Sequence, residues 1–591
     1  MPRDRLARAG GALCLILLGC LLAPTSTRAD EETPADPNQP SVQAPTGTAG
    51  RPASASTAAP EADDFLPIED RWRIGFPDWD RYAHGRRGAA PYAKGRWYDP
   101  YRQNVLKGDY PIWGRATFLN LTVLSDTVAD SRSIPTPSGI SGADPGNEDF
   151  FGGQDEFAFS TNLLLSADLF HGAAAFKPVD WRVRVTPVAN FNYLNVEERG
   201  VVNIDVREGD ERDDGQVGLQ EGFAEVKLLD VSPTYDVISL RAGVQGFLSD
   251  FRGFIFADNE AGARLFGSWG SNRSSWNLAY FRMIEKDTNS LLNTSDYDGR
   301  HQEVFIANLF RQDFLVPGYT ASLSVHVNND RPGFHFDTNG FLVRPAAVGS
   351  LRPHDIGVTY VGWTGSGHID RLNLTHALYH VSGEDSENPI AGRKVDVDAW
   401  MGALEVSMDR DWLRFRGQIF WASGDDDPRD SDAEGFDAVF DNPQFAGAGT
   451  SFWVRQGIPL TGTKVKLVGP ASLLPSLRSS KDEGQANFVN PGILLAGGGI
   501  DAELTPSLKA TANANVMRFD DTSSLELLLF QDKINRFIGV DMGLGCQWRP
   551  WLNNNFIVTA TASGLIPGEG FKEMFSDDFL YSVTASVTVV Y

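Results

Sequence analysis

Alternation of apolar and polar residues is the feature that most constrains how this chain folds. Between Trp181 and Tyr193 the odd-numbered positions are apolar and the even-numbered positions are mostly polar or charged. A period of two is typical of a β-strand with one apolar face and one wet face. About 18 such segments follow one another, near residues 113–125, 157–170, 181–194, 218–230, 237–248, 261–268, 274–285, 302–314, 319–329, 355–364, 368–382, 396–408, 411–423, 493–505, 508–519, 537–548, 555–563 and 580–591.

The length of these segments and of their connections indicates a membrane barrel. Most segments have roughly 9–14 residues, which suits tilted strands that cross a bilayer, whereas strands of soluble sandwiches are nearer five or six residues. The connections alternate between short turns, such as Gly365–Gly367, and long loops, such as 128–156 and 383–395. We therefore predict an all-β fold, an antiparallel transmembrane β-barrel of about 18 strands over residues 112–591, with both termini in the periplasm.

The N-terminal region reads as export and linker sequence. Residues 1–29 combine early arginines, an apolar stretch and a small-residue cleavage site, as in a signal peptide. A lipoprotein signal ending at Cys20 is the alternative. Residues 30–62 are rich in Pro, Ala and Thr and predict a disordered linker. Residues 63–111 carry several aromatic residues and predict a small periplasmic segment or plug.

Composition and motifs exclude several classes of function. The chain has 77 acidic and 52 basic residues, a net charge of −25, which argues against a nucleic-acid partner. No His-Glu-x-x-His, Gly-x-Ser-x-Gly or phosphate-loop motif is present, so we expect no enzyme. His376 and His380 lie about 13 Å apart on one strand face, which favours ordinary wall histidines over a metal site.

The phase of the alternation places a set of cationic side chains in the lumen, because a charge facing lipid at mid-bilayer costs about 2–4 kcal/mol. The predicted pore-lining residues are Arg182, Arg184, Lys227, Arg241, Arg264, Arg414, Arg416 and Lys509. Acids including Asp396, Asp398, Asp501 and Asp541 are expected on the same face. Either the two signs pair across the wall, or the arginines form a ladder that conducts anionic or sugar-like solutes.

The end of the chain predicts an assembly signal for the machinery that inserts outer-membrane barrels. The last strand ends on an aromatic residue and carries apolar residues at alternate positions, namely Tyr581, Val583, Val587, Val589 and Tyr591. We expect the outer face of the barrel to contact outer-membrane lipids.

Two loop features leave alternatives open. The acidic run around Asp425, Asp427, Asp430 and Asp432 could hold Ca²⁺ through oxygen ligands, or could serve solubility and the bridging of surface lipid by divalent ions. No other cofactor is expected. The connection 424–492 is too long for a loop tip. We expect it to fold into the lumen as a constriction, with a cover over the mouth or a contact to another chain as alternatives.

The strand layout and two short stretches resemble the alginate-export type of outer-membrane porins. Leu240-Arg241-Ala242-Gly243-Val244-Gln245 is similar to that family's Leu-Arg-x-Gly-Arg-Gln strand, and Ser423-Gly424-Asp425 is similar to its small-Gly-Asp step. The chain departs from the family at Val244, where the family tends to have a second arginine. The resemblance implies a porin for anionic saccharides or exported polysaccharide.

These observations predict an outer-membrane channel that passes polar, anionic or saccharide-like solutes by passive diffusion. The alternative is a structural or partner-binding barrel, such as a sheath or a component of an export machine. A sheath should have a wide lumen without an internal constriction.

Overall fold

The protein is described here by a computed structural model that covers residues 96–101, 104–114, 116–143, 146, 150–172 and 177–591. The predicted signal peptide, the linker and most of the 63–111 segment lie outside the described residues. Within them, no helix is long and apolar enough to cross a membrane.

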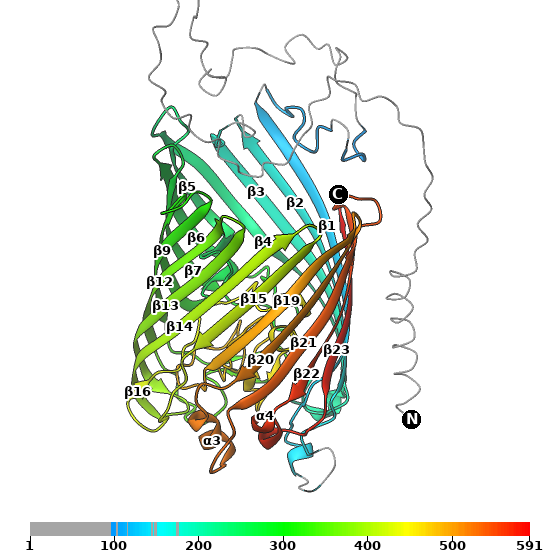
Figure 1. Ribbon diagram of the computed structural model, residues 1–591, viewed down its shortest axis with the longest axis vertical. Coiled ribbons are helices and arrows are strands. Elements are labelled where there is room, and N and C mark those ends of the chain that lie inside the picture. The colour runs from blue at the N-terminus through cyan, green and yellow to red at the C-terminus, as the bar shows by residue number, and fades with distance from the viewer. Residues whose placement is uncertain (1–95, 102–103, 115, 144–145, 147–149, 173–176) are drawn as a thin grey trace, which may run out of the picture. The chain divides into compact units, whose positions relative to one another are not determined.

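Eighteen antiparallel strands form a closed barrel, which confirms the predicted fold class (Figure 1). Each strand pairs with the next along the chain, and β1 pairs with β23 to close the sheet. The wall strands are β1 (Thr117–Ser133), β2 (Asp155–His171), β3 (Trp181–Val196), β4 (Glu211–Asp230), β5 (Val237–Leu248), β6 (Ala257–Trp269), β7 (Ser274–Ile284), β8 (Gly299–Arg311), β9 (Tyr319–Asp330), β12 (Ile356–Ile369), β13 (Leu372–Asn388), β14 (Arg393–Arg410), β15 (Leu413–Ala422), β19 (Ile493–Thr505), β20 (Leu508–Arg518), β21 (Phe537–Trp548), β22 (Phe556–Pro567) and β23 (Leu580–Val590).

The two ends of the barrel differ in their connections. At the short-turn rim, strands are joined by brief links such as 370–371 and 411–412. At the opposite long-loop rim lie the helices α3 (Ser523–Leu529) and α4 (Glu569–Met574), the 3-10 turns η1 (Ser141–Ala143) and η2 (Val206–Glu208), and the hairpin β10 (His335–Phe336) with β11 (Leu342–Arg344). Figure 1 shows α3 and α4 at the end opposite the C-terminus.

The outer face of the wall is apolar, as the alternation predicts. Leu323, Val361, Ile419 and Leu544 all point outward, and their side chains are between 52% and 65% exposed. A closed sheet with such a face leaves no backbone edge unpaired, which is the condition for a strand structure to cross a lipid bilayer.

The β15–β19 connection, residues 423–492, folds inside the wall, and we refer to it as the lumen segment. It contains β16 (Asp432–Ala433), η3 (Ala448–Thr450), α2 (Phe452–Arg455), β17 (Ile458–Pro459) and β18 (Lys466–Val468). Its apolar side chains are largely buried, and Phe436, Trp453 and Phe488 are at most 1% exposed. They join inward-facing residues of the wall strands in one hydrophobic core, so this core lies within the barrel.

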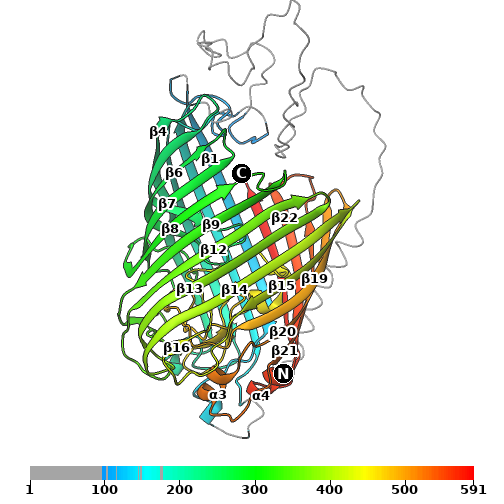
Figure 2. The same cartoon turned by 60° about the vertical axis from the view of Figure 1, so that its left-hand side comes forward.

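Some strand boundaries differ from the prediction. β12 continues past the expected turn at Gly365–Gly367 and ends at Ile369. β13 and β14 extend toward the long-loop rim, so only residues 389–392 join them instead of the predicted 383–395. Figure 2 shows this pair running down to β16, which pairs in parallel with β14.

Candidate functional site

The eight cations predicted to line the pore gather at one level of the barrel. Each lies within six residues of the end of its strand at the short-turn rim. They are Arg182 and Arg184 on β3, Lys227 on β4, Arg241 on β5, Arg264 on β6, Arg414 and Arg416 on β15, and Lys509 on β20. We refer to this set as the cationic belt.

On β3 the belt is partly neutralised by neighbouring acids. Asp168 on β2 contacts both Arg182, at 3.2 Å, and Arg184, at 2.8 Å. Arg184 also reaches Glu221 on β4 at 3.4 Å. Lys227 is held by Asp180 and Asp230 at 2.9 and 3.0 Å. The expected pairing of opposite charges across the wall is therefore present at these positions.

Arg241 and Arg264 both lie against phenylalanine rings, and within the described part of the chain only Arg241 also pairs with an acid. They occupy opposed positions of β5 and β6. The guanidinium of Arg241 lies 4.3 Å from the centroid of Phe223, and that of Arg264 lies 4.2 Å from Phe266. Glu225 pairs with Arg241 at 2.5 Å. Among the described residues Arg264 forms no ion pair, so the belt has a surplus of positive charge here.

Arg414 and Arg416 each pair with one acid. Arg414 contacts Asp409, which lies near the end of β14, and Arg416 contacts Asp501 on β19 at 3.1 Å. The expected lumen position of Asp396 and Asp398 is wrong: both are exposed on the outer face of β14. Their inward-facing neighbours are apolar, because they pack against the lumen segment near the long-loop rim.

A cavity of about 620 Å³ lies between the wall of β20–β23 and β1 and the lumen segment. Its wall part forms two rows across the sheet. In one row Thr511, Gly545, Thr561 and Thr584 are successive partners on neighbouring strands. In the second row Lys509, Gln547, Thr559, Ser586 and Val128 are successive partners.

Arg455 from α2 of the lumen segment lines the same cavity. Its guanidinium donates to the hydroxyl of Thr561 at 3.1 Å and to the carbonyl of Gly449 at 3.3 Å. In the part of the chain that the structure describes, neither Arg455 nor Lys509 has a carboxylate oxygen within 4.0 Å. Sequence reasoning missed Arg455, because it follows the apolar run Phe452–Val454 in a segment without periodicity.

The lumen segment is held on this side of the wall by buried hydrogen bonds. Asp541 on β21 accepts from the Ser451 hydroxyl at 2.7 Å and from the Phe452 amide at 2.8 Å. Asn515 on β20 donates to the carbonyl of Ala446 at 2.9 Å. Glycine at position 543 permits this approach, since a Cβ there would come within 1.7 Å of the Thr450 carbonyl oxygen.

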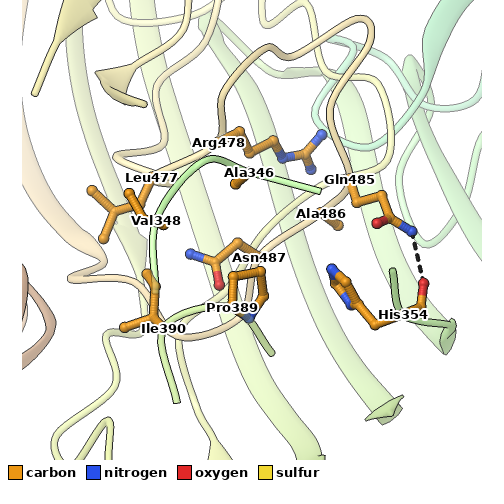
Figure 3. Close-up of a pocket in the computed structure, with 10 residues that line it drawn as sticks. All are labelled: Ala346, Val348, His354, Pro389, Ile390, Leu477, Arg478, Gln485, Ala486 and Asn487. Carbon is orange, nitrogen blue, oxygen red and sulfur yellow. Dashed lines mark hydrogen bonds between the residues drawn. The ribbon is translucent and has the colours of Figure 1, made fainter. Parts of the chain in front are cut away.

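On the opposite side the lumen segment is held by apolar packing together with hydrogen bonds. Val397, Met401 and Phe420 of the wall share a core with Phe436 and Phe445 of the segment. A cavity of about 10 Å³ lies near the long-loop rim, beside Asn487 (Figure 3). That is about the space of one water, so it offers no solute path.

A buried ion pair organises the same segment. The Nε of Arg478 contacts the Asp437 carboxylate at 2.5 Å, and the main-chain amide of Asn487 donates to the same carboxylate at 2.8 Å. Burial raises the pKa of Asp437 to about 6 despite these contacts. The Tyr360 hydroxyl of β12 donates to the Asp437 carbonyl at 2.9 Å, which ties this part of the segment to the wall.

The acidic run at the long-loop rim does not converge on one point. Within the described ranges, no three His, Cys, Asp or Glu side chains are grouped so that they could hold a metal ion. Asp425 is buried, at 1% exposure, whereas Asp427 is exposed. Burial raises the pKa of Asp425 to about 7. The neighbouring carboxylates of Asp430, Glu434 and Asp426 contribute to the same shift, because they also disfavour a charged Asp425.

The two histidines on β13 face outward, and each contacts different residues. His376 contacts the hydroxyl of Tyr319 at 2.5 Å, and its ring lies 4.5 Å from that of Trp363 in a tilted arrangement. His380 contacts Asp398 at 2.7 Å and lies beside Trp400.

The residues of the predicted assembly signal also lie on the last strand's outer face, where the side chains of Val587 and Val589 are 36% and 44% exposed. Tyr581 and Val583 share this face by alternation on β23.

Comparison with known proteins finds likeness in structure alone. No protein-family model and no curated protein matches the sequence. Among solved structures the chain is similar to OccAB4 of Acinetobacter baumannii, at 10% identity over 81% of this chain and 99% of that one, with a TM-score of 0.45. It is also similar to OccK9 of Pseudomonas aeruginosa, at 9% identity, 80% and 98% coverage and a TM-score of 0.44.

A third similar structure is a BenF-like porin from Pseudomonas fluorescens Pf-5, at 8% identity, 80% and 98% coverage and a TM-score of 0.43. These likenesses are to proteins other than the alginate-export type, so the resemblance to that type stays a prediction.

Proposed function

We propose that the protein is a passive channel of the bacterial outer membrane for small polar solutes, with a preference for anions that includes saccharide acids. The observation that carries the proposal is the cationic belt at the short-turn rim, opposite the narrow part of the lumen. Fixed charges around an aqueous path set ion preference. Arg264, Lys509 and Arg455 form no ion pair among the described residues. Arg264 lies in the wall, and Lys509 and Arg455 line the cavity, where anions would pass.

The proposal includes an orientation. The short-turn rim and both termini face the periplasm, and the long-loop rim faces outward, as is usual for outer-membrane barrels. Insertion would depend on the barrel-assembly machinery, which recognises the last strand. The alginate-export resemblance supports a saccharide-like cargo, either a sugar acid or an exported polysaccharide.

The lumen segment favours a channel over the alternative of a sheath or other partner-binding barrel. A sheath needs a wide lumen, whereas residues 423–492 occupy the interior toward the long-loop rim. A restricted lumen next to an open cavity suits a selective pore for small solutes better than passage of another protein.

Planar-bilayer recording of the purified, folded protein tests the proposal. We expect stable ohmic current steps and a reversal potential, in a salt gradient, that indicates anion preference. Liposome swelling in isosmotic sugar and sugar-acid solutions gives the solute range. Absence of both current and swelling, in protein that is correctly folded on unheated gels, would exclude the channel function.

A further inference from the structure

We propose that the described residues just before β1 anchor the closing seam of the barrel in the lipid headgroup region of the membrane. They comprise residues 96–101 and 104–113, and we refer to them as the N-terminal clasp. The inference goes beyond the channel function and does not depend on it, because it concerns the outer side of the wall at the short-turn rim.

One strand edge of the seam continues past the end of β23. The pairing of β1 with β23 runs from Arg132 to Leu124, and Tyr591 extends it to Val123. Residues 117–122 of β1 therefore lie beyond the last residue of the neighbouring strand. An open strand edge at a membrane costs free energy, since lipid offers no hydrogen-bond partner to the backbone.

The clasp supplies partners to this edge. The Leu121 amide donates to the Leu106 carbonyl at 2.7 Å, and the Leu121 carbonyl accepts from the Lys107 ammonium at 2.8 Å. At the start of the strand, the Thr117 carbonyl accepts from the Ile112 amide at 2.8 Å. The clasp therefore lies along the edge of β1, where a longer β23 would lie.

The clasp is also fixed to the last residue of the chain. Asn104 is 2% exposed, and its side-chain amide donates to the Trp97 carbonyl at 2.8 Å and to the Tyr591 hydroxyl at 3.1 Å. The Lys107 ammonium lies 4.1 Å from the centroid of the Tyr591 ring. Tyr591 shares the outward phase of Val589, so these contacts place this part of the clasp on the lipid side of the seam.

Aromatic side chains of the clasp stay exposed in this position. Trp97, Tyr101 and Trp113 are 70%, 64% and 74% exposed. The turn between β21 and β22 adds Trp551, which is 66% exposed, and the Tyr101 hydroxyl donates to Asn555 of the same turn. Tryptophan and tyrosine accumulate at the boundary between acyl chains and water, because one end of each side chain is apolar and the other stays hydrated.

This aromatic patch is continuous with the apolar outer face of the wall. Val589 is 44% exposed, and its cross-strand partner on β22 is Phe556. The ring centroid of Phe556 lies 5.0 Å from that of Trp551, so apolar surface extends from the wall to the rim. A membrane covers the wall and the rim together, whereas a partner protein would have to displace lipid from the wall. The continuity therefore favours lipid as the occupant of the patch.

Spin-label accessibility locates the clasp relative to the membrane. Nitroxides are attached at Trp97→Cys and at Trp113→Cys in a Cys546→Ser background, and the folded protein is reconstituted in vesicles of phosphatidylethanolamine and phosphatidylglycerol. Oxygen concentrates in lipid and a nickel chelate stays in water, so the ratio of their collision rates reports depth. The reference positions are Phe530→Cys, 95% exposed at the opposite rim, and Leu544→Cys, 65% exposed on the wall.

We expect collision ratios at both clasp positions that are several-fold above the ratio at Phe530→Cys and below the ratio at Leu544→Cys. Ratios equal to that of Phe530→Cys would overturn the lipid anchor, because the patch would then face water in a membrane that contains only this protein. Broadening of the spectra by spin–spin contact between labels at Trp113→Cys would likewise overturn it, since a second copy of the chain would then cover the patch.

Lipid quenching tests the same placement with variants that keep an aromatic ring. Bromine atoms in the upper part of phospholipid acyl chains quench the fluorescence of nearby tryptophans. The double variant Trp97→Phe with Trp113→Phe should lose a measurable part of the quenched intensity of the wild type. Trp453→Phe, which removes a fully buried tryptophan of the lumen segment, is the control and should lose none. Unchanged quenched intensity in the double variant would exclude the two rings from the lipid.

Discussion

The main chain of Tyr591 is hydrogen-bonded to the main chain of Val123, so the last residue of the chain takes part in the closing seam of the barrel. The Tyr591 amide donates to the Val123 carbonyl at 2.8 Å, and the Val123 amide donates back at 3.2 Å. The tyrosine ring lies 4.1 Å from the Lys107 ammonium, and its hydroxyl accepts from Asn104 at 3.1 Å.

Deletion of Tyr591 should lower the amount of folded, membrane-inserted protein several-fold. The deletion removes both seam hydrogen bonds next to an edge that faces lipid, where an unpaired backbone group costs several kcal/mol. Heat-modifiable mobility on gels of outer-membrane fractions measures the folded amount. Tyr591→Phe keeps the seam and the ring and should insert like the wild type; equal insertion of the deletion variant would show that the terminal residue is dispensable.

Reversal of Arg414 and Arg416 to Glu should shift ion preference toward cations. Each substitution changes the charge by two elementary units. The change lies in a water-filled lumen, where salt screens charges over about 8 Å at physiological ionic strength. The reversal potential in a salt gradient measures the shift, which should shrink as ionic strength rises.

The control for this prediction carries the same change of charge outside the lumen. Arg429 and Lys533 are both exposed in connections at the long-loop rim. Reversal of this pair should leave the selectivity near that of the wild type. If the two double variants shift selectivity equally, the effect belongs to the overall charge and not to the belt.

Substitution Asp541→Ala should loosen the lumen segment and raise the single-channel conductance. The Ser451 hydroxyl and the Phe452 amide would lose their acceptor, and leaving such buried donors unpaired costs about 1–3 kcal/mol. We expect larger and noisier current steps in bilayer recordings. Asp126→Asn changes another inward carboxylate, which accepts from Thr588 on the wall, and should leave the conductance unchanged.

The order of the 425–434 stretch should decrease as the pH rises. Asp425 has a folded pKa of about 7 against an ordinary value of 3.8, so between these values the folded form holds a proton that the unfolded form has lost. The stabilisation is therefore present at low pH and declines toward pH 7. A spin label at Arg429→Cys, in a Cys546→Ser background, should become more mobile from pH 5 to pH 8. With Asp425→Asn added, its mobility should stay constant over this range.

The period-two pattern located all the wall strands because lipid and lumen impose opposite polarity on alternate residues. It failed at strand ends that extend beyond the lipid. The first strand was expected to end near residue 125, yet β1 continues to Ser133. Its later outward residues, such as Thr127 and Ser131, are small and polar, so the contrast between the two faces is lost there.

Asp396 and Asp398 show the same limit in a sharper form. The rule that charges face the lumen holds where the outside is lipid and the inside is water. Near the long-loop rim of β14 the lumen is filled by apolar residues, including Phe436, and the outside faces solvent. The polarity of the two faces is therefore inverted, and the sequence of β14 alone does not reveal the inversion.

The cavity could be predicted only in part. Lys509 was placed in the lumen from its alternation with Leu508 and Ala510, and the hydroxyls of β22 and β23 follow the same phase. The position of Arg455 depends on how residues 423–492 cross the lumen. The contacts that fix it, Ser451 with Asp541 and Arg455 with Thr561, span 90 and 106 positions of sequence. No local pattern encodes contacts of that range.

The lumen segment borders an open cavity on its β20–β23 side, and this position sets an expected direction for motion. Toward β12–β15 the segment shares a hydrophobic core with the wall, and separation would expose that apolar surface to water. Toward β20–β23 it is held by hydrogen bonds that water can replace one by one. We therefore expect any widening of the passage to begin beside Asp541, next to the open cavity, and to leave Phe436 in place.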